Sequence, residues 1–383
     1  MSTGTVRSAP LTVVTPMRKR NAALCRLFLL YMRRYSKLVE VSDLKFIHFA
    51  RWQRVRVDSL PRFDGQPPED LDHDLFVFST NFNGPWDQYI DTFARVQNIR
   101  KGIRWFWRFS EGFPGPLPIR NFKQYIRYHS YPEQLYYDAY PDASVRDIAM
   151  ALTVSSRLDE FIAQGRRESE SGSDFAARFV AFVNDLADLR SGPASPPSTT
   201  HSFLTAISPI ETGSEQRTSD ALRRYLKGAE SAGNAASPLA CCPMVHMARL
   251  VILDDLRPAL GDTDAGSLHT KYLLFIAELD GPIDDFLDHL YRENPDFVAN
   301  VWGGCLGYPE DEGPVFFRQY IETCSFAPDL PFAAFPGRSV SDIERALSRR
   351  QQLMGQIGDW KTAPTMEQWR DFEAGLGGVS LHG

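Results

Sequence analysis

Apolar and polar residues follow two different periods along the first part of the chain. The segment LKFIHFARWQRV at 44–55 alternates with a period of two, which predicts a strand whose even positions share one face. Residues 85–96 instead carry apolar side chains every three to four positions behind a proline, which predicts an amphipathic helix. The same criteria predict, in order, strand 44–55, strand 75–80, helix 85–96, strand 103–110, helix 122–129, strand 135–140 and a helix capped by Ser144.

This order of elements occurs twice. Residues 121–152 and 316–347 align without a gap at an offset of 195, and 14 of the 32 positions are identical. Such a period is far too long for a solenoid, so the chain is predicted to be two fused copies of one small domain. The match continues upstream, pairing 48–52 with 246–250, 81–91 with 278–288, 110–114 with 305–309 and the expected strand 103–110 with 297–304.

The duplication predicts the domain organisation. Each copy combines strands and helices in an α+β sandwich. The connector holds an amphipathic helix at 173–190, a Pro/Ser-rich stretch and a short helix at 218–231. The predicted parts are a basic helical segment at 1–40, repeat 1 at 41–165, a connector at 166–240, and repeat 2 with a C-terminal tail at 241–383.

Charge is distributed unevenly. Residues 1–39 carry eight basic side chains and no acid, so the net charge of −6 becomes −14 for the rest of the chain. A body this acidic is not expected to bind nucleic acid, because phosphate binding requires a basic surface. Five cysteines without a CxxC pair argue against a disulfide framework or a structural zinc site, which indicates a reducing, cytoplasmic compartment.

The basic segment 17–34 has apolar residues at helical spacing and basic residues at both ends. No apolar run reaches the roughly 18–20 residues of a membrane-spanning helix. Three interpretations remain open: a helix docked on the body, a peripheral contact with an anionic membrane surface, or a targeting peptide.

Two fused α+β repeats resemble the ferredoxin-like units of the dimeric α+β barrel superfamily. In that superfamily two such units place their sheets face to face and enclose a pocket. The resemblance implies two tandem ferredoxin-like repeats packed as an intramolecular pseudo-two-fold barrel. The predicted order, with two strands before the first helix, departs from the usual βαββαβ order. The superfamily includes haem enzymes, cofactor-free oxygenases, and polyketide cyclases or lactone isomerases.

The motif His-x-Ala-Arg occurs in both copies, as His48/Arg51 and His246/Arg249. On a regular strand, positions i and i+3 point to opposite faces, so the histidine and arginine of one copy are expected not to meet. If the even face lines the pocket, the two histidines converge as an acid/base pair or as metal or haem ligands. The alternative is architectural: buried histidines, and arginines paired with acids beneath the helices.

Copy one concentrates large aromatic and basic residues where copy two has smaller ones. Aromatic walls with a few directed polar groups are typical of small-molecule pockets. His129 is a second candidate haem ligand, or a helix-end histidine bonded to its own carbonyls. The candidate substrate-binding residues are Trp52, Trp105, Trp107, Tyr136 and Tyr137.

Asp284, Asp285 and Asp288 spell DDxxD, a magnesium–diphosphate motif of all-helical terpene synthases, whose fold this chain does not match. The equivalent Asp87 and Asp91 of copy one indicate helix-start carboxylates instead. No nucleotide-binding, zinc-protease or serine-hydrolase motif is present in the sequence.

Three hypotheses follow. The first is an enzyme acting on a hydrophobic small molecule between the repeats as a haem-dependent oxidoreductase, with His246 or His129 as axial ligand and Arg249 or Arg51 stabilising negative charge. The second is a cofactor-free cyclase, isomerase or oxygenase of secondary metabolism, in which the histidines handle protons. The third is a non-catalytic, membrane-associated binding protein. A homo-oligomer is compatible with each.

Overall fold

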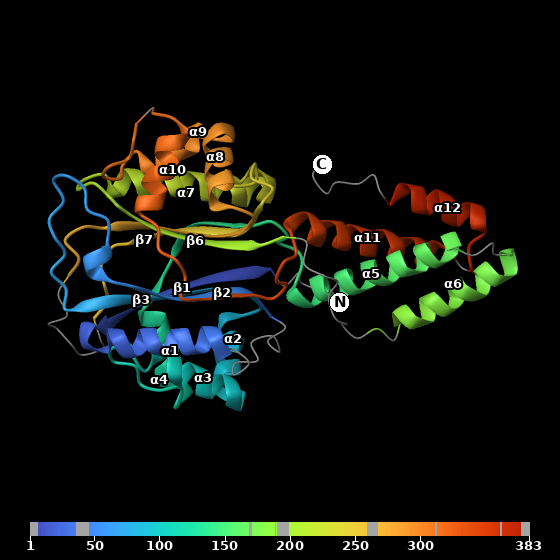
Figure 1. Cartoon of the computed structure of the whole chain (residues 1–383), viewed down its shortest axis with the longest axis horizontal. Coiled ribbons are helices and arrows are strands. Elements are labelled where there is room, and N and C mark those ends of the chain that lie inside the picture. The colour runs from blue at the N-terminus through green and yellow to red at the C-terminus, as the bar shows by residue number, and fades with distance from the viewer. Residues whose placement is uncertain are drawn as a thin grey trace. The chain divides into compact units, whose positions relative to one another are not determined.

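The structure, a computed structural model, describes residues 7–35, 46–167, 171–187, 189, 199–258, 267–310, 312–360 and 362–376. The chain divides into two compact units. The first, Met1–Asp142 with Thr200–Pro336, contains both sheets and is called the sheet unit (Figure 1). The second, Ala143–Thr199 with Gly337–Gly383, is called the helical unit.

The two halves of the sheet unit have the same order of elements, β–α–β–β–α–α–α–β, if the two-residue β4 is left aside. The first half comprises β1 (Ser8–Arg18), α1 (Ala22–Tyr35), β2 (Ile47–Val55), β3 (His73–Asn83), α2 (Trp86–Arg95), α3 (Gln97–Trp107), α4 (Ile119–Tyr128), β4 (Ser130–Tyr131) and β5 (Glu133–Asp138). The second comprises β6 (His201–Pro209), α7 (Glu215–Ala232), β7 (Val245–Leu253), β8 (Tyr272–Asp280), α8 (Ile283–Glu293), α9 (Pro295–Trp302), α10 (Pro314–Thr323) and β9 (Leu330–Ala333).

The last strand of each half belongs to the sheet of the other half. One sheet has the order β4-β1-β3-β2-β9 and the other β5-β7-β8-β6. β5 pairs antiparallel with β7, and β9 pairs antiparallel with β2. Each half therefore completes its partner's sheet, which ties the two repeats into one body.

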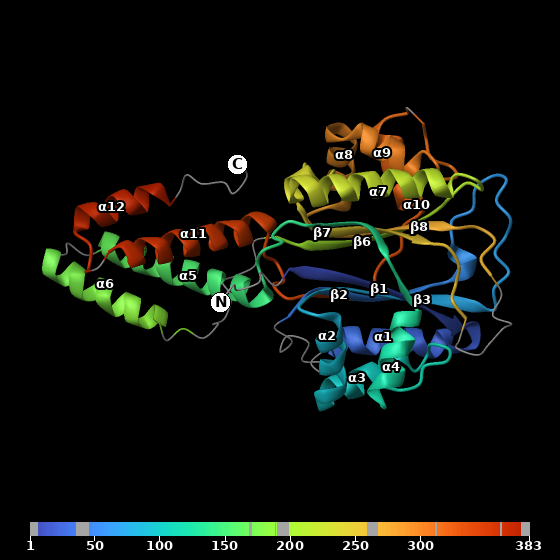
Figure 2. The same cartoon turned by 180° about the vertical axis from the view of Figure 1, so that it is seen from behind.

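The sheets face each other, and helices cover their outer faces, with α1–α4 on one side and α7–α10 on the other (Figures 1 and 2). One apolar core lies beneath each helix layer. A third joins the sheets themselves and includes Val14, Val77, Val251 and Ile276. The predicted fold class, two tandem ferredoxin-like α+β repeats packed as a pseudo-two-fold barrel, is confirmed.

The predicted order of elements needs correction at four places. Residues 103–110 and 297–304 were expected to be strands, but they lie largely in helices α3 and α9. Within α3, Ile103, Phe106 and Trp107 are buried while Trp105 is exposed, which is the spacing of a helix. In a short run rich in aromatic residues, this spacing is easily mistaken for the alternation of a strand.

Residues 8–18 and 201–209 are strands, although they were expected in a helical segment and in the connector. β1 lies inside its sheet, with the helix layer over one face and the second sheet over the other, and seven consecutive residues are buried. A strand buried on both faces shows no alternation in sequence. With β1 and α1 included, the first half has the βαββαβ order that the prediction lacked.

The helical unit is built from the closing helices of both repeats and from two further helices. These are α5 (Val145–Arg167), α6 (Gly172–Ala187), α11 (Val340–Asp359) and α12 (Met366–Gly375). Arg349 of α11 bonds Ser155 and Asp159 of α5 at 2.9 and 2.6 Å. The predicted boundaries at 165/166 and 240/241 therefore do not separate compact units, because the closing helices pack on each other.

Candidate functional site

A β-bulge in each copy changes the direction of the histidine that the two copies share. The register shifts between Ile47 and Phe49 in β2 and between Val245 and Met247 in β7. An extra residue in a strand breaks the alternation of side chains. The prediction that histidine and arginine of one copy lie on opposite faces is therefore wrong: both reach toward the opposite sheet.

Arg51 crosses to the second sheet and is fully buried. Its guanidinium donates to the carbonyl oxygens of Leu204 (2.5 Å) and Ala277 (3.0 Å) and to the hydroxyl of Thr205 (2.9 Å). It also forms an ion pair with Glu278, at 2.5 Å between Nη2 and Oε1. Burial lowers the pKa of Arg51, and the Glu278 carboxylate opposes that shift.

Arg249 makes the reciprocal crossing. Its Nη1 donates to the carbonyl oxygens of Leu11 and Thr80, both at 3.1 Å, and to Thr12 Oγ1 at 3.4 Å. Asn81 occupies the position equivalent to Glu278, so this copy lacks the buried carboxylate. The expectation that each arginine pairs with an acid beneath the helices is wrong in its location. Arg51 pairs with Glu278 and Arg249 lies 3.9 Å from Glu133, but both arginines join the two sheets.

Three side chains from neighbouring strands and one from the bend after β5 form a polar group that we call the His246 centre: His201, His246, Asp280 and Tyr140. His246 Nδ1 lies 2.9 Å from the Tyr140 hydroxyl, and its Nε2 lies 2.8 Å from Asp280 Oδ1. His201 Nε2 is 3.8 Å from the same carboxylate oxygen. His246 has no exposed surface, whereas the side chain of Asp280 is 14% exposed. One imidazole is thus held between a phenol and a carboxylate.

The pseudo-equivalent positions in the other half are chemically different. His201 pairs with Asp280 across β6 and β8, and Ser8 pairs with Asn83 across β1 and β3 in the same register. The repeat alignment places Phe335 at the position of Tyr140. Of the four groups, only the histidine is kept, as His48. The polar centre therefore exists in one half of the pseudo-symmetric pair.

His48 and His246 approach from opposing sheets, with Tyr140 near both. Its ring centroid lies 6.0 Å from that of His48 and 6.0 Å from that of His246. Burial lowers the pKa of His48 to about 4, repulsion by His246 adds to this, and a hydrogen bond with Asn83 opposes it. His48 is therefore neutral at pH 7.

The polar layer continues from Tyr140 toward Arg249. The Ser8 hydroxyl donates to the Asp138 carboxylate and lies 2.7 Å from the Tyr136 hydroxyl. Asp138 also accepts from the backbone N–H of Tyr140 at 3.0 Å. Burial raises the pKa of Asp138 to about 6 and that of Tyr140 well above its ordinary value. Tyr140 therefore keeps its proton over the neutral range.

The aromatic residues predicted to bind substrate do not line one pocket. Trp52 stacks on Phe106 beneath the helices, at 4.5 Å between ring centroids, and Trp107 is buried in the same core. Trp105 is 51% exposed, and Tyr137 belongs to the helix-side core of the other sheet. Of the five, Tyr136 alone reaches the polar layer, where its hydroxyl meets Ser8.

The inter-sheet space is not the open cavity expected from the resemblance. Its apolar half is filled by a packed cluster of residues from both sheets. Its polar half holds the crossing arginines and the His246 centre. The centre is therefore open to solvent at its rim, where Asp280 is accessible, rather than toward the middle of the barrel.

Haem does not fit the two predicted ligands. The His246 ring is enclosed by Phe49 and His201, whose ring centroids lie 5.2 and 4.9 Å from its own, which leaves no room for a porphyrin face. His129 is buried at the end of α4, with Nδ1 2.9 Å from the Tyr125 carbonyl oxygen. Its ring centroid lies 4.3 Å from that of Tyr125 and 4.9 Å from that of Tyr128, which leaves no room for a porphyrin face. Burial lowers the pKa of His129 to about 4.

The aspartates of the DDxxD motif make surface ion pairs. Asp288 lies 3.4 Å from Arg292 and 3.3 Å from Arg318, and the equivalent Asp91 lies 2.7 Å from Lys123. These contacts tie helices together and support the structural interpretation.

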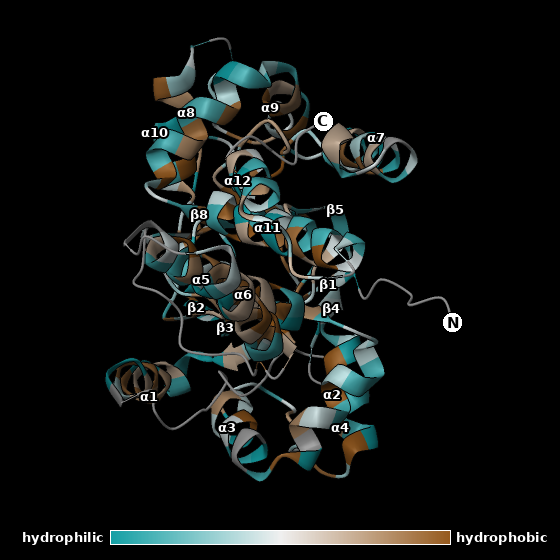
Figure 3. Ribbon diagram, turned by 90° about the vertical axis from the view of Figure 1, so that its right-hand side faces the viewer, coloured by the Kyte–Doolittle hydropathy of each residue, from teal (hydrophilic) through white to brown (hydrophobic). Residues whose placement is uncertain are grey.

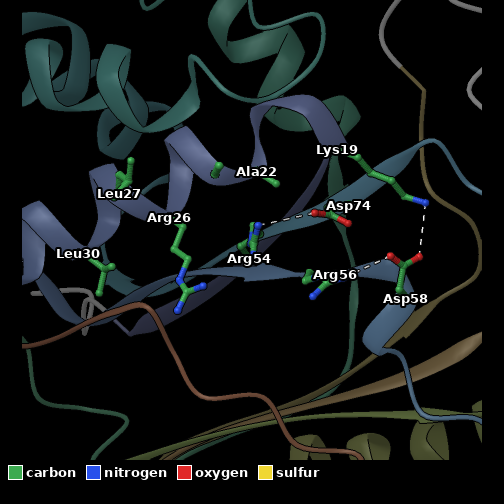
Figure 4. Close-up of a pocket in the computed structure, with 10 residues that line it drawn as sticks. Lys19, Ala22, Arg26, Leu27, Leu30, Arg54, Arg56, Asp58 and Asp74 are labelled. Atoms are coloured by element: carbon green, nitrogen blue, oxygen red, sulfur yellow. Dashed lines mark hydrogen bonds and ion pairs between the residues drawn. The ribbon is translucent and has the colours of Figure 1, made fainter.

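A separate groove of about 580 Å³ lies beside α1 (Figure 4). Its charged lining is mostly basic, and each acid is near a basic partner: Lys19 and Arg56 lie 3.5 and 3.4 Å from Asp58.

Among the described residues, no helix combines the length and apolar character needed to cross a membrane.

No protein-family model matches the chain, and no curated protein matches it. Solved structures do match. An "anthrone oxidase-like protein" is 6% identical, with a TM-score of 0.27, over 88% of this chain and 98% of that chain. A "putative monooxygenase from Lactobacillus acidophilus NCFM" is 6% identical, with a TM-score of 0.29, over 85% and 97%. Similarity this low transfers no activity to this chain.

Sequence analysis identified His246 but missed Tyr140, His201 and Asp280. The repeat alignment contained a signal for two of them. Tyr140 stands opposite Phe335, and Asp280 stands opposite Asn83, so each is a polar or charged replacement in one copy. His201 lies in a segment read as connector, so it had no aligned partner.

Proposed function

We propose that this chain is an enzyme that acts on a hydrophobic small molecule at the His246 centre and moves a proton to or from it. The observation that carries the proposal is the position of His246, hydrogen-bonded on one nitrogen to Tyr140 and on the other to Asp280. This arrangement occurs in one half of a duplicated fold. A purely architectural role would be needed equally in both halves, so the asymmetry favours a functional role.

The hydrogen bonds suggest how the proton would move. With Nε2–H donating to Asp280, Nδ1 accepts from the Tyr140 hydroxyl. A substrate C–H or O–H would then give its proton to the Tyr140 oxygen while the phenolic proton passes to Nδ1. The imidazolium formed in this step is stabilised by the Asp280 carboxylate, as in other histidine–carboxylate pairs.

Nearby aromatic rings favour an apolar substrate. Phe49 of β2 lies 5.2 Å from His246 and 6.2 Å from Phe203 between ring centroids. Proton transfer without a haem is the chemistry of cyclases, isomerases and cofactor-free oxygenases. The chain's residues therefore support that hypothesis better than the haem-dependent one.

The test is solvent deuterium exchange into an acidic C–H, followed by NMR on a panel of aromatic 1,3-diketones. We expect the wild-type protein to accelerate exchange for at least one member, and His246→Gln and Asp280→Asn to reduce the rate by at least about 100-fold. His129→Gln is the matched control, since it removes a buried histidine at the end of α4, outside the His246 centre. Equal rates in His246→Gln and wild type, or no acceleration at all, would refute the proposal.

A second candidate function, membrane association, rests on the surface of α1. One face of this helix is docked, with Cys25, Leu29 and Met32 buried. A second apolar face is open to solvent, and Figure 3 colours most of the helix as hydrophobic. The exposed residues are Leu24 (62%), Leu27 (64%), Leu30 (52%) and Tyr31 (51%).

Charge complementarity points to an anionic phospholipid surface as the occupant. Arg20, Arg26, Arg33 and Arg34 are exposed around these apolar side chains. Leu27 and Leu30 also line the basic groove (Figure 4). An apolar face framed by arginines is the arrangement that binds at an anionic bilayer interface.

Vesicle flotation tests the second candidate. We expect binding to phosphatidylserine-containing vesicles but not to pure phosphatidylcholine, and its loss in Leu24→Ser/Leu27→Ser. Leu117→Ser, also at an exposed leucine of the sheet unit, is the control. Deletion of residues 1–39 is unsuitable because it would remove β1 from within its sheet. Unchanged flotation of the double variant would refute the candidate.

A further inference from the structure

We infer that the His246 centre is a binding site for one divalent transition-metal ion, with His201, His246 and Asp280 as ligands. The inference rests on the proposed function for its catalytic meaning, since the ion would act on the same substrate. With the ion in place Nδ1 keeps its proton, so the substrate proton would pass to solvent rather than through Tyr140 to Nδ1. The binding of the ion can be measured without any substrate.

The first argument is the spacing of the donor atoms. One ring nitrogen of each histidine and one carboxylate oxygen of Asp280 all lie within 4.8 Å of one another. Metal–ligand bonds of roughly 2.0–2.2 Å place neighbouring donor atoms roughly 3–3.5 Å apart. Two of the three present separations, 2.8 Å from His246 to Asp280 and 3.8 Å from His201 to Asp280, lie on either side of that range, and the two histidines are within 4.8 Å. Small side-chain rotations would therefore complete the site.

The second argument is the rigidity of the scaffold. The three ligands come from β6, β7 and β8, which are adjacent in one sheet. His201 and Asp280 are direct cross-strand partners, and the bulge in β7 directs His246 toward them. Ligands on paired strands lose little freedom on binding, which favours a preformed site.

The third argument is the outer partner of His246. A metal-binding histidine usually bonds through its second nitrogen to a polar group that fixes its tautomer. Tyr140 occupies that position, 2.9 Å from Nδ1. With an ion bound, Nδ1–H would donate to the Tyr140 oxygen, and the Nε2 lone pair would face the ion in place of the proton shared with Asp280.

The donor set determines the class of ion and its use. Two imidazoles and one carboxylate suit zinc, iron(II), manganese or cobalt better than calcium or magnesium, which prefer oxygen. Three protein ligands leave positions open for a substrate oxygen, whose attached proton becomes more acidic on a Lewis acid. The exposed part of Asp280 gives the side from which ion and substrate would enter.

The duplication supplies an internal comparison. The equivalent positions in the other half are Ser8, His48 and Asn83, which offer one imidazole and no carboxylate. The inference therefore predicts one strong site in the whole sheet unit. A pair of sites would indicate binding elsewhere.

The experiment uses the whole 383-residue chain, treated with a chelator and titrated with Co²⁺ alone, followed by visible absorption and calorimetry. We expect one equivalent bound with new d–d bands, displaced by Zn²⁺. Asp280→Asn and His201→Ala should each weaken binding by at least 100-fold, and Tyr140→Phe by about 10-fold. His269→Ala, which removes an exposed histidine outside the centre, is the control and should bind as the wild type does. Circular dichroism and melting curves check that the variants are folded.

Binding that is unchanged in Asp280→Asn, or Co²⁺ uptake without spectral change, would overturn the inference. Its failure can be separated from that of the proposed function. Deuterium exchange that persists in the chelated protein, with no Co²⁺ site, refutes the metal ion alone. A single Co²⁺ site without any exchange activity refutes the proton-transfer proposal alone.

Discussion

Replacing Arg51 by methionine should destabilise the sheet unit more than the equivalent change at Arg249. Both side chains are fully buried and cross between the sheets. They differ in their partners. Arg51 neutralises the buried Glu278, whereas Arg249 bonds two carbonyl oxygens and a hydroxyl, with Glu133 3.9 Å away. Methionine fills much of the same volume and removes the charge.

The size of the difference follows from the group left behind. Arg51→Met leaves the Glu278 carboxylate buried and unpaired, and removing one partner of a buried ion pair costs about 3–5 kcal/mol. Arg249→Met leaves neutral acceptors without a donor, while Glu133 is partly exposed and keeps its hydrogen bond from Thr12, so the cost is about 1–3 kcal/mol. The free energy of unfolding should therefore fall by about 2 kcal/mol more for Arg51→Met.

Urea unfolding followed by circular dichroism gives the stability change, provided that the slopes agree between variants. Hydrogen exchange measured by mass spectrometry at residues 201–209 and 272–280 assigns the loss to the strands that Arg51 contacts. The double variant Arg51→Met/Glu278→Gln is the key control, because it removes both charges and should regain about 2 kcal/mol.

Two results would contradict this reasoning. Equal destabilisation by Arg51→Met and Arg249→Met would mean that leaving the Glu278 carboxylate buried without a partner costs no additional stability. A double variant no more stable than Arg51→Met would mean that the loss comes from packing rather than from charge.

Three further predictions concern stability. The pKa of His48 is lowered to about 4 from about 6.5, so the stability that this residue contributes is present above pH 6.5 and is lost as the pH falls toward 4, by about 3 kcal/mol. In His48→Gln, the free energy of unfolding measured with urea should therefore depend less on pH over that interval. An unchanged pH dependence would count against the pKa shift. Leu29→Ala should cost about 2–5 kcal/mol, while Leu27→Ala, on the exposed face of the same helix, should change stability by less than about 0.5 kcal/mol in thermal unfolding; equal losses would argue against the docking of α1. Gly307 has φ +75° and an added Cβ would overlap Phe63, so Gly307→Ala should lower the melting temperature, and a neutral result would exclude that close approach.

The internal duplication allowed much of the fold to be predicted from the sequence. Aligned repeats revealed two α+β halves, and periodicity located β2, β3, α2 and their counterparts. The exchange of β5 and β9 between sheets could not be read, because strand pairing depends on contacts between distant segments. β1 was missed since a strand covered on both faces shows no alternation of apolar and polar residues.

Only part of the candidate site could be predicted from the sequence. The shared His-x-Ala-Arg pattern located His246 and Arg249, but ideal alternation placed them on opposite faces. A β-bulge, which leaves no reliable mark in sequence, brought both to the same side. The residues that give His246 its chemistry come from other elements, Tyr140 from the bend after β5 and Asp280 from β8, and only the tertiary fold brings them together.

Nitrogen-15 NMR of the histidine rings tests the Tyr140–His246–Asp280 chain most directly. We predict that Tyr140→Phe shifts the His246 Nδ1 resonance, that Asp280→Asn shifts the Nε2 resonance, and that the His129 resonances stay in place in both variants. His246 resonances that move in neither variant would show that this imidazole is not held between the phenol and the carboxylate.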